Sequence, residues 1–301
     1  MTTVWIIAGM MVLIVAASAY FASLVIHPRT FPLQKTVEIE VDKGRMNPAE
    51  YAAWEKQEIS LPSPHGYPIT GTYLPLPGAQ KTAILVHGFT YTRYGSVKYV
   101  PIFRSRGYNT LIIDLRYHGG SGGDNTTFGY FEKDDLKVWT DWAFGQLGAD
   151  GRVGLHGESM GASIALQYAP LDPRLAFVIA DCGFSDLRAE LAYRMRVEYR
   201  LPAFPVLDLA NVFCWLLTGG MTFGRVSPIR TIDQIHAPLF FIHGQSDGYI
   251  LPKMSVAMYE ARKTGYRKIY LAPGAHHAES FNTNPAEYDR QVGEFLQEIA
   301  G

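Results

Sequence analysis

The sequence contains little that could form a disulfide framework or a metal site. Cys182 and Cys214 are its two cysteines, and they lack the CxxC spacing of zinc and redox sites. No pair of histidines has the HExxH spacing of a metalloprotease. We therefore expect two buried free thiols, no metal ion and no cofactor.

An excess of charge of either sign is also missing. The formal net charge is -1, so the chain has neither the basic excess that attracts nucleic acid nor an acidic tail. Repeats and low-complexity segments are absent. With 48% hydrophobic and 18% charged residues, the 301-residue chain has the composition of a globular protein. We expect no nucleic-acid partner, and the sequence leaves the oligomeric state open.

Charged residues are missing altogether between Trp5 and Ile26. A helix of this length would extend about 33 Å, enough to cross a hydrocarbon core of about 30 Å. We predict a transmembrane anchor over residues 1–26. The alternatives are a cleaved signal peptide ending at Ala17-Ser18-Ala19 and a buried core helix. No Lys or Arg precedes the run and no face of it is polar, which disfavours both.

The side of the membrane is only weakly indicated. Arg29 and Lys35 follow the apolar run, and the positive-inside rule then places the rest of the chain on the cytoplasmic side. Removal of residues 1–26 is expected to leave a soluble, active protein.

After the apolar run, residues 27–57 are expected to form a linker, over 27–46, and a short helix that begins at Asn47-Pro48. A strand pair is expected over 58–76. Beyond it, short apolar runs typical of buried parallel strands alternate with stretches long enough for crossover helices. The runs are 82–87, 110–115, 152–157, 175–181, 238–244 and 268–272, and the helical stretches are 95–106, 132–147, 160–169, 254–264 and 285–299. This pattern predicts an α/β fold with a mostly parallel central sheet and helices on both faces.

One insertion interrupts this alternation. The residues between Asp181 and Pro238 contain no clear strand, but LRAELAYRMRVEYR and VLDLANVFCWLLTGGM can both be helical. We predict a helical lid over about 185–235. Its four arginines favour the solvated face of a lid helix over a grip on an anionic head group. They are Arg188, Arg194, Arg196 and Arg200.

The most specific motif is Gly157-Glu158-Ser159-Met160-Gly161, a GxSxG match. It follows a predicted strand and opens a predicted helix, as a strand–turn–helix elbow requires. Glycines lack Cβ atoms, so the helix and the neighbouring chain can approach closely at the bend. The alternative is an ordinary glycine-rich turn with a capping serine.

On these motifs the chain resembles the α/β-hydrolase superfamily, and within it the bacterial single-domain serine hydrolases with an N-terminal apolar segment. The resemblance covers residues 58–301. It rests on the GxSxG elbow, on His87-Gly88-Phe89-Thr90 after a strand, and on a DxRGHGxS-like stretch in which Tyr117 replaces the first glycine. It also rests on HGQSDGYILP and GAHHAES, which carry the later site residues.

The resemblance implies a triad in the order Ser159, Asp247, His277. Ser159 would be the nucleophile, His277 its general base and Asp247 the group that holds the imidazole tautomer. The resemblance also implies an oxyanion hole formed by the N–H groups of Phe89 and Met160. The family pattern G-x-x-H-A favours His277 over its neighbour His276.

The remaining polar residues are expected to be structural. His87 would shape the oxyanion turn, and His118 would brace loops. Buried, hydrogen-bonded positions are expected for His156 and His243, and a structural role for Glu158. Asp114 and Asp181 end strands and would serve turns, and Asp114 comes too early in the chain to be the first choice for the triad acid.

Three functions remain open. The first is a hydrolase of carboxylic esters, such as a carboxylesterase or lipase, acting on a small-molecule or lipid ester through an acyl-enzyme. The second is a serine peptidase related to prolyl oligopeptidases, although the chain has no room for their N-terminal propeller. The third is a non-catalytic, membrane-tethered binding module, which an ordered Ser, Asp and His disfavours. A serine in the elbow also disfavours haloalkane and epoxide hydrolases of this fold, which use aspartate.

Overall fold

The fold is built on one eight-stranded sheet. The computed structural model describes residues 1–300, and its strands are ordered β1-β2-β4-β3-β5-β6-β7-β8. The first three strands in this order pair antiparallel, and all later pairs are parallel. The bounds are β1 Gln57–Pro62, β2 Pro68–Leu74, β3 Lys81–Val86, β4 Asn109–Ile113, β5 Arg152–Glu158, β6 Phe177–Asp181, β7 Leu239–Gly244 and β8 Arg267–Ala272. The predicted α/β fold with a mostly parallel sheet is confirmed.

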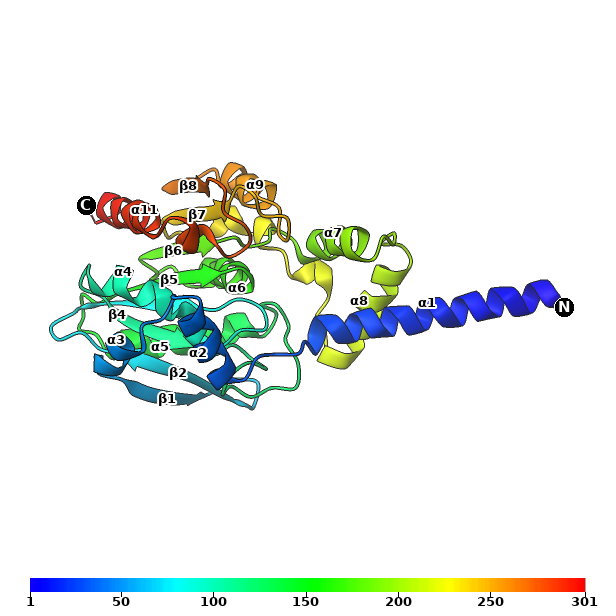
Figure 1. Cartoon of the computed structure of the whole chain (residues 1–301), viewed down its shortest axis with the longest axis horizontal. Helices are drawn as coiled ribbons and strands as arrows, with labels where there is room; N and C mark the ends of the chain where they lie inside the picture. Colours follow the sequence, from blue (N-terminus) through cyan, green and yellow to red (C-terminus); the bar gives the residue numbers. More distant parts are fainter. Residues whose placement is uncertain (301) are drawn as a thin grey trace.

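Helices cover both faces of this sheet (Figure 1). The α-helices are α1 Thr2–Ile26, α2 Leu33–Asp42, α3 Pro48–Ala53, α4 Val100–Arg104, α5 Glu132–Gly145, α6 Met160–Tyr168, α7 Leu187–Glu198, α8 Val206–Thr218, α9 Lys253–Ala261, α10 Ser280–Thr283 and α11 Pro285–Glu298. Short 3-10 turns are η1 Arg93–Tyr99, η2 Ala169–Leu171, η3 Phe223–Arg225, η4 Pro228–Arg230 and η5 Ile232–Gln234.

Two apolar cores form because successive strand residues point to opposite faces. In β3, Ile84 and Val86 join the core under α5 and α6, whereas Ala83 and Leu85 join the core under α4 and α11. The central strands are therefore buried on both sides, which explains their continuous apolar runs.

The segment before β1 is more ordered than the sequence indicated. The predicted linker over 27–46 is wrong for Leu33–Asp42, which form α2. This helix packs against η1, and its Val37 and Val41 reach the second core. The short helix at Asn47-Pro48 is present as α3, where the Asn47 side chain accepts hydrogen bonds from the N–H groups of Ala49 and Glu50 at 3.0 and 3.3 Å.

The lid helices lie between β6 and β7, as predicted. They are α7 and α8, and α1 packs beside α8 before projecting away from the body (Figure 1). By its length and composition, α1 is long and apolar enough to cross a membrane. Its last turns are buried at Ser18, Ala22 and Ile26, so its C-terminal part belongs to the body.

Candidate active site

Ser159 sits on a sharp bend between β5 and α6. Its backbone has φ 55° and ψ −116°, a left-handed conformation that a residue with a Cβ rarely adopts. Its N–H donates to the Asp181 carbonyl at 2.7 Å. A Cβ on Gly157 would lie 2.4 Å from the Gly161 carbonyl oxygen, and one on Gly161 would lie 2.3 Å from the Val86 oxygen. The predicted reason for both glycines, close approach of chain and helix, is confirmed.

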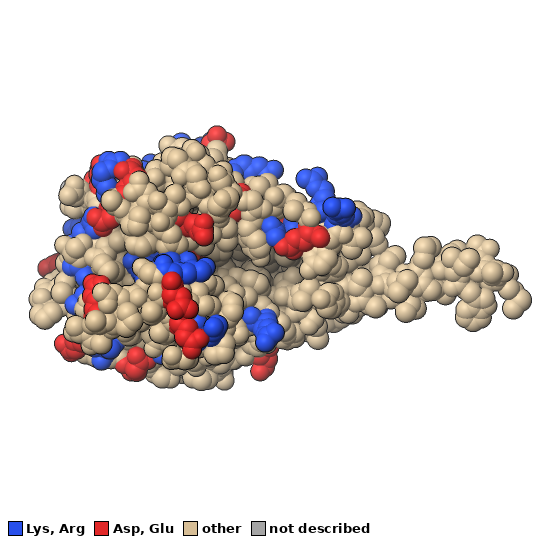
Figure 2. Space-filling view, viewed as in Figure 1, with Lys and Arg blue, Asp and Glu red and all other residues tan. Residues whose placement is uncertain are grey.

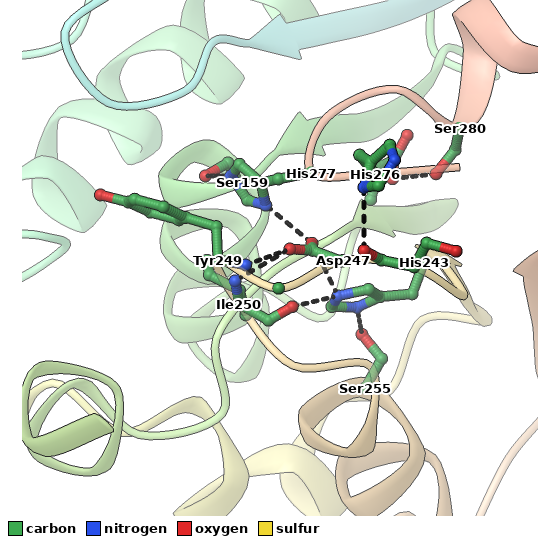
Figure 3. Close-up of polar contacts among 12 residues, drawn as sticks. Ser159, His243, Asp247, Tyr249, Ile250, Ser255, His276, His277 and Ser280 are labelled. Carbon is green, nitrogen blue, oxygen red and sulfur yellow. Dashed lines mark hydrogen bonds and ion pairs between the residues drawn. The ribbon is translucent and has the colours of Figure 1, made fainter. Parts of the chain in front are cut away.

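The three predicted residues Ser159, His277 and Asp247 lie together at the carboxyl edge of the sheet (Figure 3). The Ser159 Oγ lies 2.9 Å from His277 Nε2, and His277 Nδ1 lies 2.7 Å from Asp247 Oδ2. This alignment permits a proton to move from the hydroxyl to the imidazole while the carboxylate holds the opposite ring nitrogen.

Asp247 is buried in a dense set of donors. Its Oδ1 accepts hydrogen bonds from the N–H groups of Tyr249 and Ile250 at 2.8 and 3.0 Å. Burial alone would raise the pKa of Asp247, but hydrogen bonds from His243 and His277 outweigh it and hold that pKa well below its ordinary value. Asp247 is therefore ionised at neutral pH and oriented by its own loop.

His243 is a part of the site whose role the sequence did not indicate. It is buried, as predicted, but its Nε2 lies 3.1 Å from Asp247 Oδ2 and 2.9 Å from the Ile250 carbonyl, while its Nδ1 lies 2.7 Å from the Ser255 hydroxyl. The position of His243 four residues before Asp247, on β7, is the signal that could have identified this contact.

His276 points away from the nucleophile. Its Nδ1 lies 3.0 Å from the Ser246 carbonyl, and the side chain is exposed (Figure 3). Of the two neighbouring histidines, His277 is the one that contacts both Ser159 and Asp247.

Phe89 and Met160, the expected oxyanion donors, flank Ser159. Both line the cavity beside the serine, and a Cβ on Gly88 would lie 3.4 Å from the Ser159 Cβ, so the turn after β3 touches the nucleophile. Met160 is the first residue of α6, so its N–H has no acceptor within that helix.

The histidines next to this turn are buried and neutral. His87 Nδ1 lies 2.7 Å from the Gly88 carbonyl, and its Nε2 accepts a hydrogen bond from Leu115 N–H at 3.0 Å. His118 Nε2 accepts one from Thr90 N–H at 3.3 Å. Burial lowers the pKa of His87 and of His118 to about 4. Both side chains thus fix the turn after β3, in agreement with their expected structural roles.

The other buried polar residues also have structural partners. His156 Nε2 lies 2.7 Å from the Tyr288 hydroxyl. Glu158, next to the nucleophile, pairs with the ammonium of Lys98 at 2.6 Å. Burial opposes ionisation of Glu158, but Lys98 and Tyr99 outweigh that effect and lower its pKa. Asp114 pairs with Arg93 at 2.9 Å, so it is not part of the triad.

An apolar cavity of about 280 Å³ opens beside Ser159. Its walls come from the bend at Ser159 and Met160, the turn after β3, Phe128 before α5, the lid, the loop after β7 and the C-terminal part of α1. The residues contributed by α1 are Phe21, Leu24 and Val25. Side chains of the predicted anchor therefore line the same cavity as Ser159.

A second, polar hollow meets the first at Ser159. It is lined by His277 and Gly88 and by charged side chains of both signs, namely Lys43, Arg45, Lys98, Glu158 and Glu279. Ser159 therefore lies between an apolar space and a polar one, an arrangement suited to a substrate with one apolar and one polar end.

Glu190 of α7 is the unusual member of the apolar cavity. Its side chain is 5% exposed, and within residues 1–300 neither of its carboxylate oxygens has a hydrogen-bond partner. Burial raises the pKa of Glu190 to about 8, and the charge of Arg194 offsets this only in part. Glu190 is thus largely protonated at neutral pH.

The lid arginines do not act as a group. Arg194 lies over the Tyr249 ring, 3.9 Å from its centroid, and its guanidinium reaches the Gly248 carbonyl at 3.3 Å. Arg188 pairs with Asp208 at 2.6 Å, while Arg196 and Arg200 are exposed. The solvated-face expectation therefore fails for Arg194, which links α7 to the loop that carries Asp247.

Cys182, Asp247 and His277 place three potential ligand atoms within 4.8 Å of one another. They fit a metal poorly, because the His277 Nδ1 and Asp247 Oδ2 atoms that it would need bond to each other at 2.7 Å. Burial also raises the pKa of the Cys182 thiol well above its ordinary value, and a thiol must lose its proton to bind a metal.

The chain is similar to a known protein family and to proteins of two bacteria. The family model described as X-Pro dipeptidyl-peptidase (S15 family) matches residues 14–210. An uncharacterized protein of Bacillus subtilis, YqkD, is 36% identical over 97% of this chain and 96% of its own length. An uncharacterized protein of Mycobacterium tuberculosis is 24% identical over 73% of this chain and 72% of its own.

Solved structures with the same fold include hydrolases. An esterase of Pyrococcus furiosus superposes with a TM-score of 0.69 at 27% identity, covering 85% of this chain and 95% of that one. An acylaminoacyl peptidase of Pyrococcus horikoshii superposes with a TM-score of 0.61 at 15% identity, covering 82% of this chain and 41% of the peptidase. The second likeness concerns the fold alone.

Proposed function

Because the chain belongs to the X-Pro dipeptidyl-peptidase (S15) family and is a serine hydrolase with the α/β-hydrolase fold, we propose that it hydrolyses carboxylic esters with apolar acyl groups through Ser159, His277 and Asp247. The observation that carries this proposal is the Ser159 hydroxyl, 2.9 Å from the His277 imidazole and at the edge of an apolar cavity. The likeness to the Pyrococcus furiosus esterase supports it.

The proposed reaction has two halves. The Ser159 oxygen attacks the ester carbonyl while His277 Nε2 takes its proton. The negative oxygen of the tetrahedral intermediate accepts hydrogen bonds from the N–H groups of Phe89 and Met160. The intermediate collapses, the C–O bond to the alcohol breaks, and His277 returns the proton to the leaving alcohol.

Water completes the cycle. His277 removes a proton from a water molecule as its oxygen attacks the acyl-enzyme, and the proton then passes to the Ser159 oxygen as the acid leaves. Asp247 holds Nδ1 protonated and stabilises the imidazolium in both halves. His243 acts as a positioning residue, because it contacts Asp247 and not the reacting atoms.

Labelling with a fluorophosphonate tests the nucleophile. The wild type is expected to be labelled at Ser159, and Ser159→Ala is expected to be unlabelled and inactive. Ser163→Ala is the matched control, since this serine is also buried but bonds to the Phe184 carbonyl at 3.0 Å. Label on any other residue would contradict the assignment.

A serine peptidase is the second candidate, and Glu190 favours it. A buried carboxyl group without a partner in the described chain could pair with the amino group of a peptide substrate. p-Nitrophenyl esters of increasing chain length, compared with proline-containing peptide amides, separate the two candidates. A higher kcat/KM for the peptide amides than for the esters would identify the protein as a peptidase. Fluorophosphonate labelling of Ser159 would exclude the third function, a non-catalytic binding module.

We further propose that the projecting part of α1 anchors the protein in a membrane. Residues such as Trp5, Leu13 and Val12 are largely exposed, and Figure 2 shows no charged side chain on this part. Alkaline carbonate extraction of cell membranes is the test: the full chain should stay in the membrane fraction, and its release into the supernatant would refute the anchor. Cleavage after Ala19 would identify a signal peptide instead.

A further inference from the structure

α1 contributes a wall to the cavity of the nucleophile. Phe21 and Val25 are half-buried, and Leu24, 39% exposed, also lines the cavity. These residues are spaced three and four positions apart, so they share one face of the helix. Ser159 and Met160 line the same cavity. An acyl chain bound in this cavity would therefore lie beside both α1 and the bend at Ser159.

This wall is fixed to the catalytic body. Ala22 and Ile26 are fully buried, and the Ile26 carbonyl accepts a hydrogen bond from Thr126 N–H at 2.9 Å. The Phe21 ring meets the Tyr199 ring of the lid edge to face, with centroids 4.7 Å apart. Further along, Phe31 N–H donates to the Thr90 carbonyl, in the turn after β3, at 2.8 Å. The wall therefore has a defined position relative to Ser159.

The outer face of α8 continues the apolar surface of α1. Leu207, Ala210 and Cys214 face inward, whereas Val212, Trp215 and Leu216 are about half exposed on the other side. Leu217 and Phe204 are also exposed. A helix that is apolar on both faces does not suit water, and a large apolar patch marks a contact surface. Because α8 lies beside α1, the same lipid layer can cover both helices.

We propose that Phe21, Leu24 and Val25 form the acyl-binding wall of the site, and that its substrate is an ester of a membrane lipid. This inference rests on the proposed esterase function. The acyl chain reaches Ser159 from the bilayer between α1 and the lid. The alcohol part occupies the polar hollow on the other side of Ser159, and leaves from it with the proton of His277. The two hollows thus match the two ends of an amphipathic ester.

A protonated Glu190 is compatible with an acyl chain in the apolar cavity. An ionised carboxylate in the cavity would oppose burial of an acyl chain, whereas the neutral acid removes most of that cost. The raised pKa of Glu190 supports the neutral form at pH 7. Above pH 8, Glu190 gains a negative charge beside Arg194, Glu198 and Asp247, so binding of a long chain should weaken.

The test measures hydrolysis of esters of increasing acyl length by variants in which a larger side chain fills part of the cavity. Leu24→Trp and Val25→Trp place a larger side chain in the wall, and Leu13→Trp is the matched control on the exposed part of the same helix. The full-length proteins, in one detergent, hydrolyse p-nitrophenyl acetate, butyrate, octanoate and palmitate. Loss of two or more buried methylenes predicts a fall of about tenfold or more in kcat/KM for octanoate and palmitate. The activity of the wall variants on acetate should fall much less than their activity on palmitate, and all activities of Leu13→Trp should change less than about twofold.

A second arm tests the membrane route. A fluorogenic phosphatidylcholine in vesicles of the same lipid is supplied to the reconstituted protein. Trp215→Glu with Leu216→Glu should slow its hydrolysis about tenfold or more and leave p-nitrophenyl acetate unchanged, since a charge at the lipid face is unfavourable. Leu171→Glu, an exposed leucine outside the lid and α1, is the control and should match the wild type.

The outcomes separate the two proposals. If the wild type hydrolyses esters but the wall variants keep the wild-type chain-length profile, the acyl wall is wrong and the esterase function stands. If vesicle-borne ester is hydrolysed equally by the α8 variant, or not at all by the wild type, the membrane substrate is wrong. Should the wild type hydrolyse no ester of any length, both proposals fail together.

Discussion

The two sides of Ser159 are built by different means. On the polar side, hydrogen bonds of 2.7 and 3.1 Å join Asp247 to His277 and to His243, which lies near the end of β7. On the apolar side, α1, α7 and α8 meet by side-chain packing, and the buried Glu190 has no hydrogen-bond partner within residues 1–300. The hydrogen-bonded groups thus depend on atomic positions, whereas the cavity depends on volume and polarity. Changes on the first side should affect all substrates, and changes on the second should discriminate among them.

The largest expected effect lies on the polar side. His277→Ala should reduce kcat for every ester by about 10⁴-fold or more, because the triad works as a unit. His276→Ala, its neighbour, should retain activity within about threefold, since its imidazole contacts only the Ser246 carbonyl. Steady-state kinetics with p-nitrophenyl acetate measure both. An inactive His276 variant beside an active His277 variant would reverse the assignment.

Deletion of residues 1–26 tests the apolar side most severely. The sequence predicted a soluble, active product, but the structure indicates that deletion removes one cavity wall and uncovers the packed face of α8. We expect kcat/KM for octanoate to fall about tenfold or more and acetate hydrolysis to be affected less. Thermal denaturation monitors folding in parallel. Unchanged octanoate kinetics with an unchanged Tm would mean that α1 serves only as an anchor.

A positioning residue should give an intermediate effect. His243→Phe removes a hydrogen bond to ionised Asp247, a contact worth about 1.5–3 kcal/mol, so kcat should fall about tenfold or more with little change in KM. Because that bond helps to hold the pKa of Asp247 down, the acidic limb of the pH–kcat profile should also move upward. Ser255→Ala, which removes the partner of the other ring nitrogen, is the milder control. A changed KM with an unchanged pH profile would argue for a merely structural role.

The smallest expected effect is on the pH dependence of folding stability, through the carboxyl group of Glu190. The folded-state pKa of Glu190, about 8, exceeds the ordinary value of 4.5 for a glutamate, so between these pH values the folded state retains a proton that the unfolded state loses. Stability should therefore fall as pH rises from about 5 to 8. Glu190→Gln should remove this dependence and raise the Tm relative to the wild type most at pH 8 to 9. Parallel Tm curves of the two proteins across pH 5–9 would contradict the raised pKa.

The same contrast explains how much could be predicted from the sequence. Strands β3 to β7 could be predicted, because burial on both faces produces continuous apolar runs such as AILV. The elbow at Ser159 could be predicted, because its glycines are required by contacts within a short stretch of chain. Both depend on local pattern.

Features that depend on distant contacts could not be predicted. The helix α2 could not be predicted, because its packing partner, η1, lies some fifty residues further along the chain. Phe21 and Leu24 are the residue types that a membrane anchor also uses, so composition does not distinguish lipid-facing from cavity-facing positions. His243 was placed as buried, but its contact with Asp247 depends on how the loop after β7 folds back.

The glycines at 157 and 161 have a consequence for engineering this protein. Even a methyl group at either position would collide with backbone carbonyls rather than with movable side chains. Variants at these two positions should therefore be largely misfolded, whereas Leu24 and Trp215 are 39% and 49% exposed and lie on helices outside the sheet. Directed evolution of substrate range should therefore start at the helices that line the cavity and leave the bend untouched.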